Sequence, residues 1–232
     1  MPWYYYLDPT MLVVLPALIL SVWAQINVKT TYSKYSRVNT RSGITGFDAA
    51  RRILDANGLY DVGIELIPGE LSDHYDPRAN VIRLSNAVYS STSAAAVGVA
   101  SHEAGHAVQH AVGYTPIKLR TAVIGISNFG SMAAMPLFFI GLIMASQPLM
   151  YLGIIFYSLA MVFQLVTLPV EFNASRRAMD ALSDSGRFTS DELKASRKVL
   201  SAAALTYVAA LATSLLSLLR LILIANGNNR RR

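Results

Sequence analysis

The chain has 232 residues, of which 53% are hydrophobic and 15% are charged, a composition that excludes an ordinary soluble domain and predicts a membrane protein. It contains no cysteine, so disulfides, thiolate metal sites and a cysteine nucleophile are excluded, and histidine and carboxylate side chains remain as metal ligands. The net charge of +6 comes without any nucleic-acid-binding motif, and we therefore expect no nucleic-acid partner.

The first element in chain order is an uncharged apolar stretch at residues 11–26, which predicts a membrane span. Aromatic residues at positions 3–6 and Trp23 flank it, as expected at membrane–water interfaces. A cleaved signal peptide needs a positively charged start, whereas the first residues contain no Lys or Arg and include Asp8. We therefore expect a membrane anchor that is retained.

A polar region follows the first span and is expected to fold outside the membrane. Thr45 and Asp48 have the spacing of an N-cap and an acidic N3 residue, so a helix is predicted to begin there and to end at Gly58. Apolar residues alternate with polar ones at 62–67 and 81–85, which predicts two short strands.

A second helix of the polar region is predicted from about residue 93 to 112. Ser93 can cap it, its body is rich in Ala and Val, and Gly113 and Pro116 follow its end.

Three further apolar stretches lie at 121–145, 149–169 and 202–225, each close to the ~20 residues that a helix needs to cross a membrane. Ser146–Pro148 separate the first two, which predicts a tight helical hairpin. Arg220 interrupts the last stretch. We expect its side chain to reach toward the interface, the alternative being that it faces the helix bundle and pairs with a carboxylate.

These elements predict a mainly α membrane protein, with about four transmembrane helices and a small α+β domain that contains a short sheet. The predicted divisions are an N-terminal anchor at 1–28, the polar α+β domain at 29–120, a transmembrane hairpin at 121–170, a polar helical segment at 171–201, and a last transmembrane helix with a basic tail at 202–232.

The helix predicted at 93–112 carries the pattern His-Glu-x-x-His, formed by His102, Glu103 and His106. Residues four apart share one helical face about 6 Å apart, so both imidazoles can bind one Zn²⁺ while the intervening carboxylate faces the water on the metal. Zinc lowers the pKa of that water toward ~7, and a carboxylate can then take its proton. We interpret Glu103 as the general base, with one zinc per chain. A surface helix with solvated His and Glu side chains is the alternative.

A catalytic zinc site needs a third protein ligand and an open fourth position. His110 continues the series, but it lies eight residues after His102, which corresponds to ~12 Å of helical rise and is too far for one ion. Glu171, at the end of the third span, is the better candidate, because two crossings between 121 and 169 return the chain to the side that it left. A carboxylate that merely caps a helix start is the alternative.

Five segments carry a recognisable pattern. They are Asp73–Pro77 (DHYDP), His102–Gln109 (HEAGHAVQ) and Thr167–Ser175 (TLPVEFNAS), with Trp23–Gln25 near the start and Ala204–Ala210 near the end. Together they resemble the YugP-type neutral zinc metallopeptidases of bacterial membranes. The resemblance therefore extends over nearly the whole chain.

The resemblance implies a zincin-like fold related to the HtpX-like membrane proteases, with His102, His106 and Glu171 as zinc ligands and Glu103 as the base. HtpX-like proteins place an Asp four residues after the ligand Glu, where this chain has Ser175. The usual carboxylate partner of a ligand histidine is therefore missing. Three residues remain as candidates to replace it: Asn173, Asp180 and Asp76.

The segment Asp73–Pro77 precedes the strand predicted at 81–85, which in related zincins would be the edge strand that pairs with an extended substrate. His74 or Tyr75 could donate a hydrogen bond to the oxyanion of the reaction and is a candidate catalytic residue. A plain turn is the alternative reading of this segment, because Asp-Pro is common in turns.

Basic residues predict the orientation. Of the 20 Lys and Arg residues, 10 lie in 29–120 and 6 in 171–200, all on one side of the membrane if the four spans cross it. The positive-inside rule then places the zinc site in the cytoplasm, although Arg230–Arg232 would lie outside.

The sequence thus predicts a multi-pass enzyme of the cell membrane that uses zinc to hydrolyse peptide bonds of membrane proteins or peptides. Its partners are the peptide substrate and the lipid bilayer, and a membrane-protein partner or an oligomer is compatible with the sequence. Two alternatives stay open. One is a non-catalytic membrane scaffold with a structural zinc, and the other is a metal hydrolase that acts on a non-peptide amide or ester.

Overall fold

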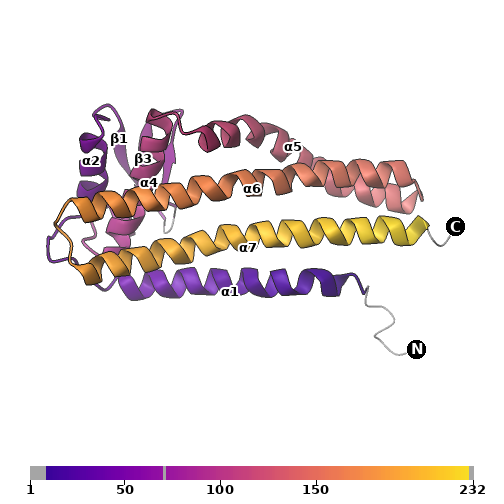
Figure 1. Ribbon diagram of the computed structural model, residues 1–232, viewed down its shortest axis with the longest axis horizontal. Helices are drawn as coiled ribbons and strands as arrows, with labels where there is room; N and C mark the ends of the chain where they lie inside the picture. The colour runs from indigo at the N-terminus through magenta and orange to yellow at the C-terminus, as the bar shows by residue number, and fades with distance from the viewer. Residues whose placement is uncertain (1–8, 70–71, 230–232) are drawn as a thin grey trace. The chain divides into compact units, whose positions relative to one another are not determined.

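The computed structural model describes residues 9–69 and 72–229, which are mostly helical (Figure 1). The aromatic residues at 3–6, Asp8 and the basic residues Arg230–Arg232 lie outside this part. In chain order the elements are α1 (Met11–Tyr35), α2 (Gly46–Ala56), β1 (Gly63–Ile67), β2 (His74–Asp76), β3 (Val81–Ser85), α3 (Asn86–Tyr89), α4 (Ala94–Ala111), α5 (Thr115–Ile143), α6 (Gln147–Asp184) and α7 (Ser190–Asn229).

Within residues 9–69 and 72–229, four helices, α1, α5, α6 and α7, are long and apolar enough to cross a membrane. They contain the four predicted spans, except that α5 ends at Ile143 and not at residue 145, and they confirm a mainly α membrane protein with a small α+β part. Residues 144–146 join α5 to α6, as the predicted hairpin requires. Both α6 and α7 continue well beyond their apolar parts, so the polar segment 171–201 consists of the end of one helix, a short turn and the start of the next.

The chain divides into two compact units, and the first comprises Met1–Ala24, Leu119–Leu168 and Thr206–Arg232. Its core is formed by the buried residues Phe138, Met150, Ile154, Leu221 and Ala225. Large apolar side chains, such as those of Leu12, Ile19, Phe129, Met132 and Ile143, are exposed on it. An apolar surface of this extent is suited to contact with lipid rather than water.

Polar side chains of the first unit hydrogen-bond to one another or to the backbone. The hydroxyls of Ser21 and Thr213 lie 2.9 Å apart, and Ser127 Oγ donates to the carbonyl of Leu159 at 3.0 Å. Such pairing is what helices in a membrane require, because lipid offers no hydrogen-bond partner.

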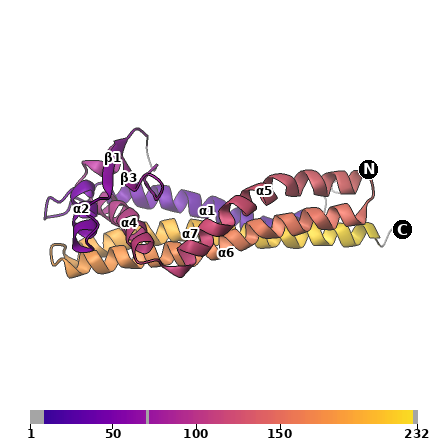
Figure 2. The same ribbon diagram turned by 90° about the horizontal axis from the view of Figure 1, so that it is seen from above.

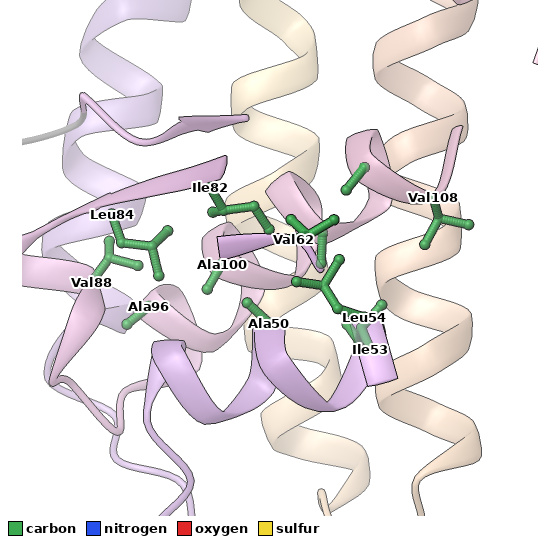
Figure 3. Packing of buried hydrophobic residues seen from close by; sticks show 12 residues of the cluster. Ala50, Ile53, Leu54, Val62, Ile82, Leu84, Val88, Ala96, Ala100 and Val108 are labelled. Carbon is green, nitrogen blue, oxygen red and sulfur yellow. The ribbon is translucent and has the colours of Figure 1, made fainter. Parts of the chain in front are cut away.

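The second unit comprises Gln25–Lys118 and Pro169–Leu205. Figure 3 shows its core, where side chains of α2, the sheet and α4 meet. The buried apolar residues of this cluster are Ala50, Ile53, Leu54, Val62, Ile82, Leu84, Val88, Ala96, Ala100, Ala104, Ala107 and Val108. In Figure 2, α2, β1, β3 and α4 likewise lie close together in space. The small residues of α4 allow both α2 and the sheet to approach it closely.

The predicted capping box of α2 is confirmed. Thr45 Oγ1 accepts a hydrogen bond from the Asp48 amide at 3.1 Å, and the Thr45 amide donates to Asp48 Oδ2 at 3.0 Å. Hydrogen bonds from Thr45 hold the pKa of Asp48 below its ordinary value. The helix ends as predicted, because Gly58 has a positive φ of 71°, a conformation that glycine adopts at little cost.

The sheet has the order β1-β3-β2, with β3 parallel to β1 and antiparallel to β2. The strands predicted at 62–67 and 81–85 are therefore present, but the prediction that 81–85 is an edge strand is wrong. It lies in the centre, because the segment His74–Asp76, whose alternative reading was a plain turn, pairs with it as β2.

Polar contacts hold β2 in place. Asp76 accepts a hydrogen bond from Arg83 of β3 at 2.7 Å, and this contact, with backbone hydrogen bonds from Arg78 and Ala79, lowers the pKa of Asp76 to about 2. Asp73 accepts from the Ser85 amide at 2.7 Å. Since the strand is short and its side chains are polar, it shows none of the apolar alternation by which strands are predicted.

Replacing Thr45 with Ala should lower the free energy of unfolding by about 1 kcal/mol, because the amide of the third helical residue loses its acceptor. Thermal unfolding of the detergent-solubilised protein, followed by circular dichroism, measures the loss. Thr30→Ala is the control, since this exposed hydroxyl bonds only to carbonyls of its own helix. Equal melting temperatures for Thr45→Ala and the parent protein would show that the Thr45 cap does not stabilise the fold.

Candidate metal centre

The helix α4 presents two histidines on one face. Ser93 caps the helix by accepting a hydrogen bond from the Ala96 amide at 3.2 Å, as the sequence predicts. His102 and His106 lie one turn apart, and their ring centroids are 4.6 Å apart in an edge-to-face arrangement. Both side chains are mostly buried, with 16% and 12% of their surface exposed. The imidazoles therefore converge on one point within the second unit.

Glu171 of α6 meets this pair. Its Oε2 lies 3.3 Å from His102 Nε2 and 3.5 Å from His106 Nε2, and its side chain is 4% exposed. Ligand atoms that share one tetrahedral zinc at ~2.1 Å stand about 3.4 Å apart. The two separations between histidine and glutamate match this value, and all three ligand atoms lie within 4.8 Å of one another, so the side chains could share a metal ion.

A close approach of two helices brings Glu171 within reach. A Cβ atom at Gly105 would lie 2.7 Å from the carbonyl oxygen of Ala174 on α6, closer than any side chain permits. Glycine at this position of the His-Glu-x-x-His segment therefore allows the backbones of α4 and α6 to touch. Gly98, two turns earlier, similarly faces Ser196 of α7, whose Cβ would be 3.2 Å away.

Glu103 lies beside the two histidines and is buried, with 8% of its surface exposed. Burial raises the pKa of Glu103, and positive charge on His102 or His106 would oppose this rise. The backbone N–H of Tyr75 donates to Glu103 Oε2 at 3.0 Å. This hydrogen bond holds the carboxylate next to the candidate metal ligands, and the role of Glu103 as general base stays a prediction.

Burial acts to lower the pKa of His106, but the hydrogen bond that its ring donates to Glu171 and the negative charge of Glu103 outweigh this effect, so the pKa is raised. A metal ion must therefore compete with a proton at this imidazole, and metal binding should weaken as the pH falls.

The structure places the two candidate oxyanion donors on the strand β2. His74 is exposed and its Nδ1 lies 2.8 Å from the carbonyl oxygen of Ser72. The hydroxyl of Tyr75 donates to Asn80 Oδ1 at 3.0 Å, so this residue reaches Glu103 through its backbone and not through its hydroxyl. A direct role of either side chain in the reaction stays a prediction. The ring of His110 packs against Tyr75, with centroids 5.5 Å apart.

Two residues that hydrogen-bond to the histidines were not predicted from the sequence. Ser175 Oγ lies 3.1 Å from His102 Nδ1, at the position where HtpX-like proteins would have an Asp. Gln109 Oε1 lies 3.0 Å from His106 Nδ1. The sequence could have indicated Gln109, because it lies three residues after His106 and therefore on the same helical face. Of the candidates proposed for this role, Asn173 bonds to Gln109, whereas Asp76 is engaged by Arg83 of β3.

Comparison with known proteins shows the family to which the chain belongs. Residues 10–226 match the family model described as "Putative neutral zinc metallopeptidase". The chain belongs to this family. It is 50% identical over 214 residues to the "Putative membrane protease YugP" of Bacillus subtilis (strain 168), a match that covers 92% of this chain and 95% of the relative. No match was found among solved structures. The resemblance to YugP-type proteins is thereby confirmed.

The family implies zinc, and the donors of the site fit it. Two imidazole nitrogens and one carboxylate oxygen are ligands that zinc accepts, and three protein ligands leave the fourth position open. The HtpX-like relation and the individual roles of the residues stay predictions.

Replacing Glu171 with Ala should weaken zinc binding by more than the ~100-fold that loss of an outer partner costs, because a direct ligand is removed. The same is expected for His106→Ala. Elemental analysis of purified protein, with chelator competition for the dissociation constant, measures the effect. Glu65→Ala is the matched control, since Glu65 is exposed and contacts Arg83. Full zinc occupancy in Glu171→Ala would show that the third ligand is wrongly assigned.

Replacing Gly105 with Ala should weaken zinc binding about 10-fold or more, since the new methyl group pushes the α6 backbone, and with it Glu171, away from the histidines. Gly125→Ala is the control, because nothing lies within 4 Å of a Cβ atom at that helical position. The same competition assay compares the two variants. Unchanged affinity in Gly105→Ala would mean that the helix contact does not determine where Glu171 lies.

Proposed function

We propose that this protein is a membrane-embedded zinc endopeptidase that hydrolyses peptide bonds of membrane proteins or peptides. The observation that carries the proposal is the convergence of His102, His106 and Glu171 beside the buried carboxylate of Glu103. A structural zinc site in a scaffold would need the ligands but no carboxylate of this kind. The family and the membrane protease to which the chain is similar support the same reading.

In this proposal His102 and His106 hold zinc through Nε2, and Glu171 holds it through a carboxylate oxygen. When bound, zinc supplies Lewis-acid chemistry, which polarises the peptide carbonyl and lowers the pKa of water. Glu103 accepts the proton of the attacking water and passes it to the leaving amine. Because burial raises its pKa, Glu103 is better matched to both transfers than an ordinary exposed carboxylate. The amide of Tyr75 keeps it oriented.

The strand β2 takes the role that was predicted for 81–85. Along an antiparallel strand, N–H groups point alternately toward and away from the partner strand. The N–H of Tyr75 points away from β3, since it donates to Glu103. An extended peptide that pairs with this edge would lie next to the base and bond to the carbonyl of Tyr75, because the Tyr75 N–H already donates to Glu103. Backbone pairing of this kind accepts many sequences. This arrangement suits a peptidase better than a hydrolase for small esters or amides.

The location follows from the chain path and the charges. Glu171 comes two residues after Pro169, where the apolar part of α6 ends, so the metal ligand belongs to the interface end of a predicted span. The polar regions 29–120 and 171–200 carry 10 and 6 of the 20 basic residues. By the positive-inside rule these regions face the cytoplasm. We therefore place the site on the cytoplasmic side of the cell membrane, where substrates in the same bilayer arrive by lateral diffusion.

Replacing Glu103 with Gln should keep zinc bound and reduce cleavage by about 100- to 10,000-fold, the usual contribution of general acid–base catalysis. Cleavage of an unfolded, fluorescently labelled protein by the full chain in liposomes measures the rate, and elemental analysis measures zinc. Glu65→Gln is the control and should match the parent.

Two results would reject this assignment. Unchanged cleavage by Glu103→Gln would show that Glu103 is not the general base. Cleavage by the parent protein that survives complete removal of zinc would show that the reaction does not need the metal. Hydrolysis of small esters or non-peptide amides without any cleavage of peptides would favour the other class of hydrolase.

A further inference from the structure

A buried chain of polar side chains runs from His106 to Arg177. Gln109 is completely buried, and its Oε1 lies 3.0 Å from His106 Nδ1. The Gln109 Nε2 donates to the carbonyl of Val170 at 2.8 Å and to Asn173 Oδ1 at 3.0 Å. Arg177 Nε donates to the same Asn173 oxygen at 2.9 Å. One side chain of α4 is thus bonded both to a candidate metal ligand and to the turn of α6 that carries another.

The direction of these hydrogen bonds is fixed at both ends. A main-chain carbonyl such as that of Val170 can only accept, and a guanidinium such as that of Arg177 can only donate. Gln109 must therefore turn its amide nitrogen toward Val170 and its amide oxygen toward His106. The Nδ1 of His106 then has to carry a proton.

A neutral imidazole carries one proton, so a proton on Nδ1 leaves Nε2 bare. This Nε2 is the atom of His106 that lies 3.5 Å from Glu171 and that would bind the metal. The network therefore selects the tautomer that can act as a ligand. His102 is different, because its Nδ1 faces the hydroxyl of Ser175, and a hydroxyl can either donate or accept.

We propose that Gln109 is a positioning residue that presets His106 for metal binding through Nε2 and ties the Glu171 turn of α6 to α4. The proposal rests on the proposed function only in taking zinc as the metal. It explains why a fully buried glutamine stands here. An apolar residue of equal size would fill the space, but it would leave the buried His106 Nδ1–H without an acceptor and would remove the bonds that join α4 to Val170 and Asn173 of α6.

The first test is the zinc affinity of the full chain in detergent, measured by competition with a chromophoric chelator. Gln109→Met keeps the length of the side chain and removes all three hydrogen bonds. Its dissociation constant should rise about 10- to 100-fold, as is usual when the outer partner of a ligand histidine is lost.

The matched control is Ser101→Ala on the same helix. The Ser101 hydroxyl is buried and has no hydrogen-bond partner among the described residues, so its removal should leave the affinity unchanged. Parent affinity in Gln109→Met would overturn the proposal.

A second pair of variants tests the direction of the bonds and decides the question if Gln109→Met does not fold. Asn173 accepts from Gln109 and Arg177 through one oxygen. Asn173→Asp keeps an acceptor there and should retain the parent's zinc affinity, whereas Asn173→Leu should weaken it. Equal zinc affinities of Asn173→Asp and Asn173→Leu would show that this hydrogen-bond network does not determine zinc binding.

A spectroscopic readout separates positioning from packing. The chain has four histidines, so protein labelled with ¹⁵N-histidine gives few ring signals, and His106→Asn identifies the one from His106. The parent should show a slowly exchanging Nδ1–H proton at His106, which Gln109→Met loses and Ser101→Ala keeps. A parent protein that binds zinc but cleaves no peptide would overturn the proposed function and leave this inference intact. Persistence of the protected His106 proton in Gln109→Met would overturn this inference and leave the proposed function intact.

Discussion

The backbone contact between α4 and α6 at Gly105 and Ala174 is the constraint on which the candidate site depends. Two candidate ligands lie on α4 and the third on α6, about 65 to 70 residues later in the sequence. A carboxylate side chain is short, so it reaches the imidazoles only if the helices touch. Glycine permits this contact, and the buried amide of Gln109 secures it by bonding to the carbonyl of Val170. The absence of a side chain at Gly105 and the polar contacts of Gln109 thus determine the geometry together.

Local patterns in the sequence were sufficient for those elements whose signal is local. The helix with the two histidines, its Ser93 cap and the Thr45 capping box are present as predicted, because a cap and a helical period are set by residues within one or two turns. The apolar spans are helical for the same reason. The third candidate ligand, Glu171, was found by a different argument, the count of membrane crossings, and it does lie beside the pair.

What the sequence did not indicate depends on contacts between distant residues. The strand β2 exists because Asp76 and Asp73 bind residues of β3, and the pattern of His74–Asp76 alone resembles a turn. The hydrogen bonds of Ser175 and Gln109 to the imidazoles depend on how α4 and α6 pack. The early start of α7 is an exception, since Thr189 and Glu192 form reciprocal hydrogen bonds of the capping-box type that the sequence spacing already contains.

The backbone N–H of Tyr75 connects substrate recognition to chemistry in the proposed peptidase. It holds Glu103, and it belongs to the edge strand along which an extended peptide would pair. Burial raises the pKa of Glu103 but would leave the carboxylate free to rotate, and the hydrogen bond from the Tyr75 amide fixes its direction. Since a short strand held by polar contacts at both of its ends supplies that bond, the position of the proposed base depends on the same strand along which the proposed substrate would pair.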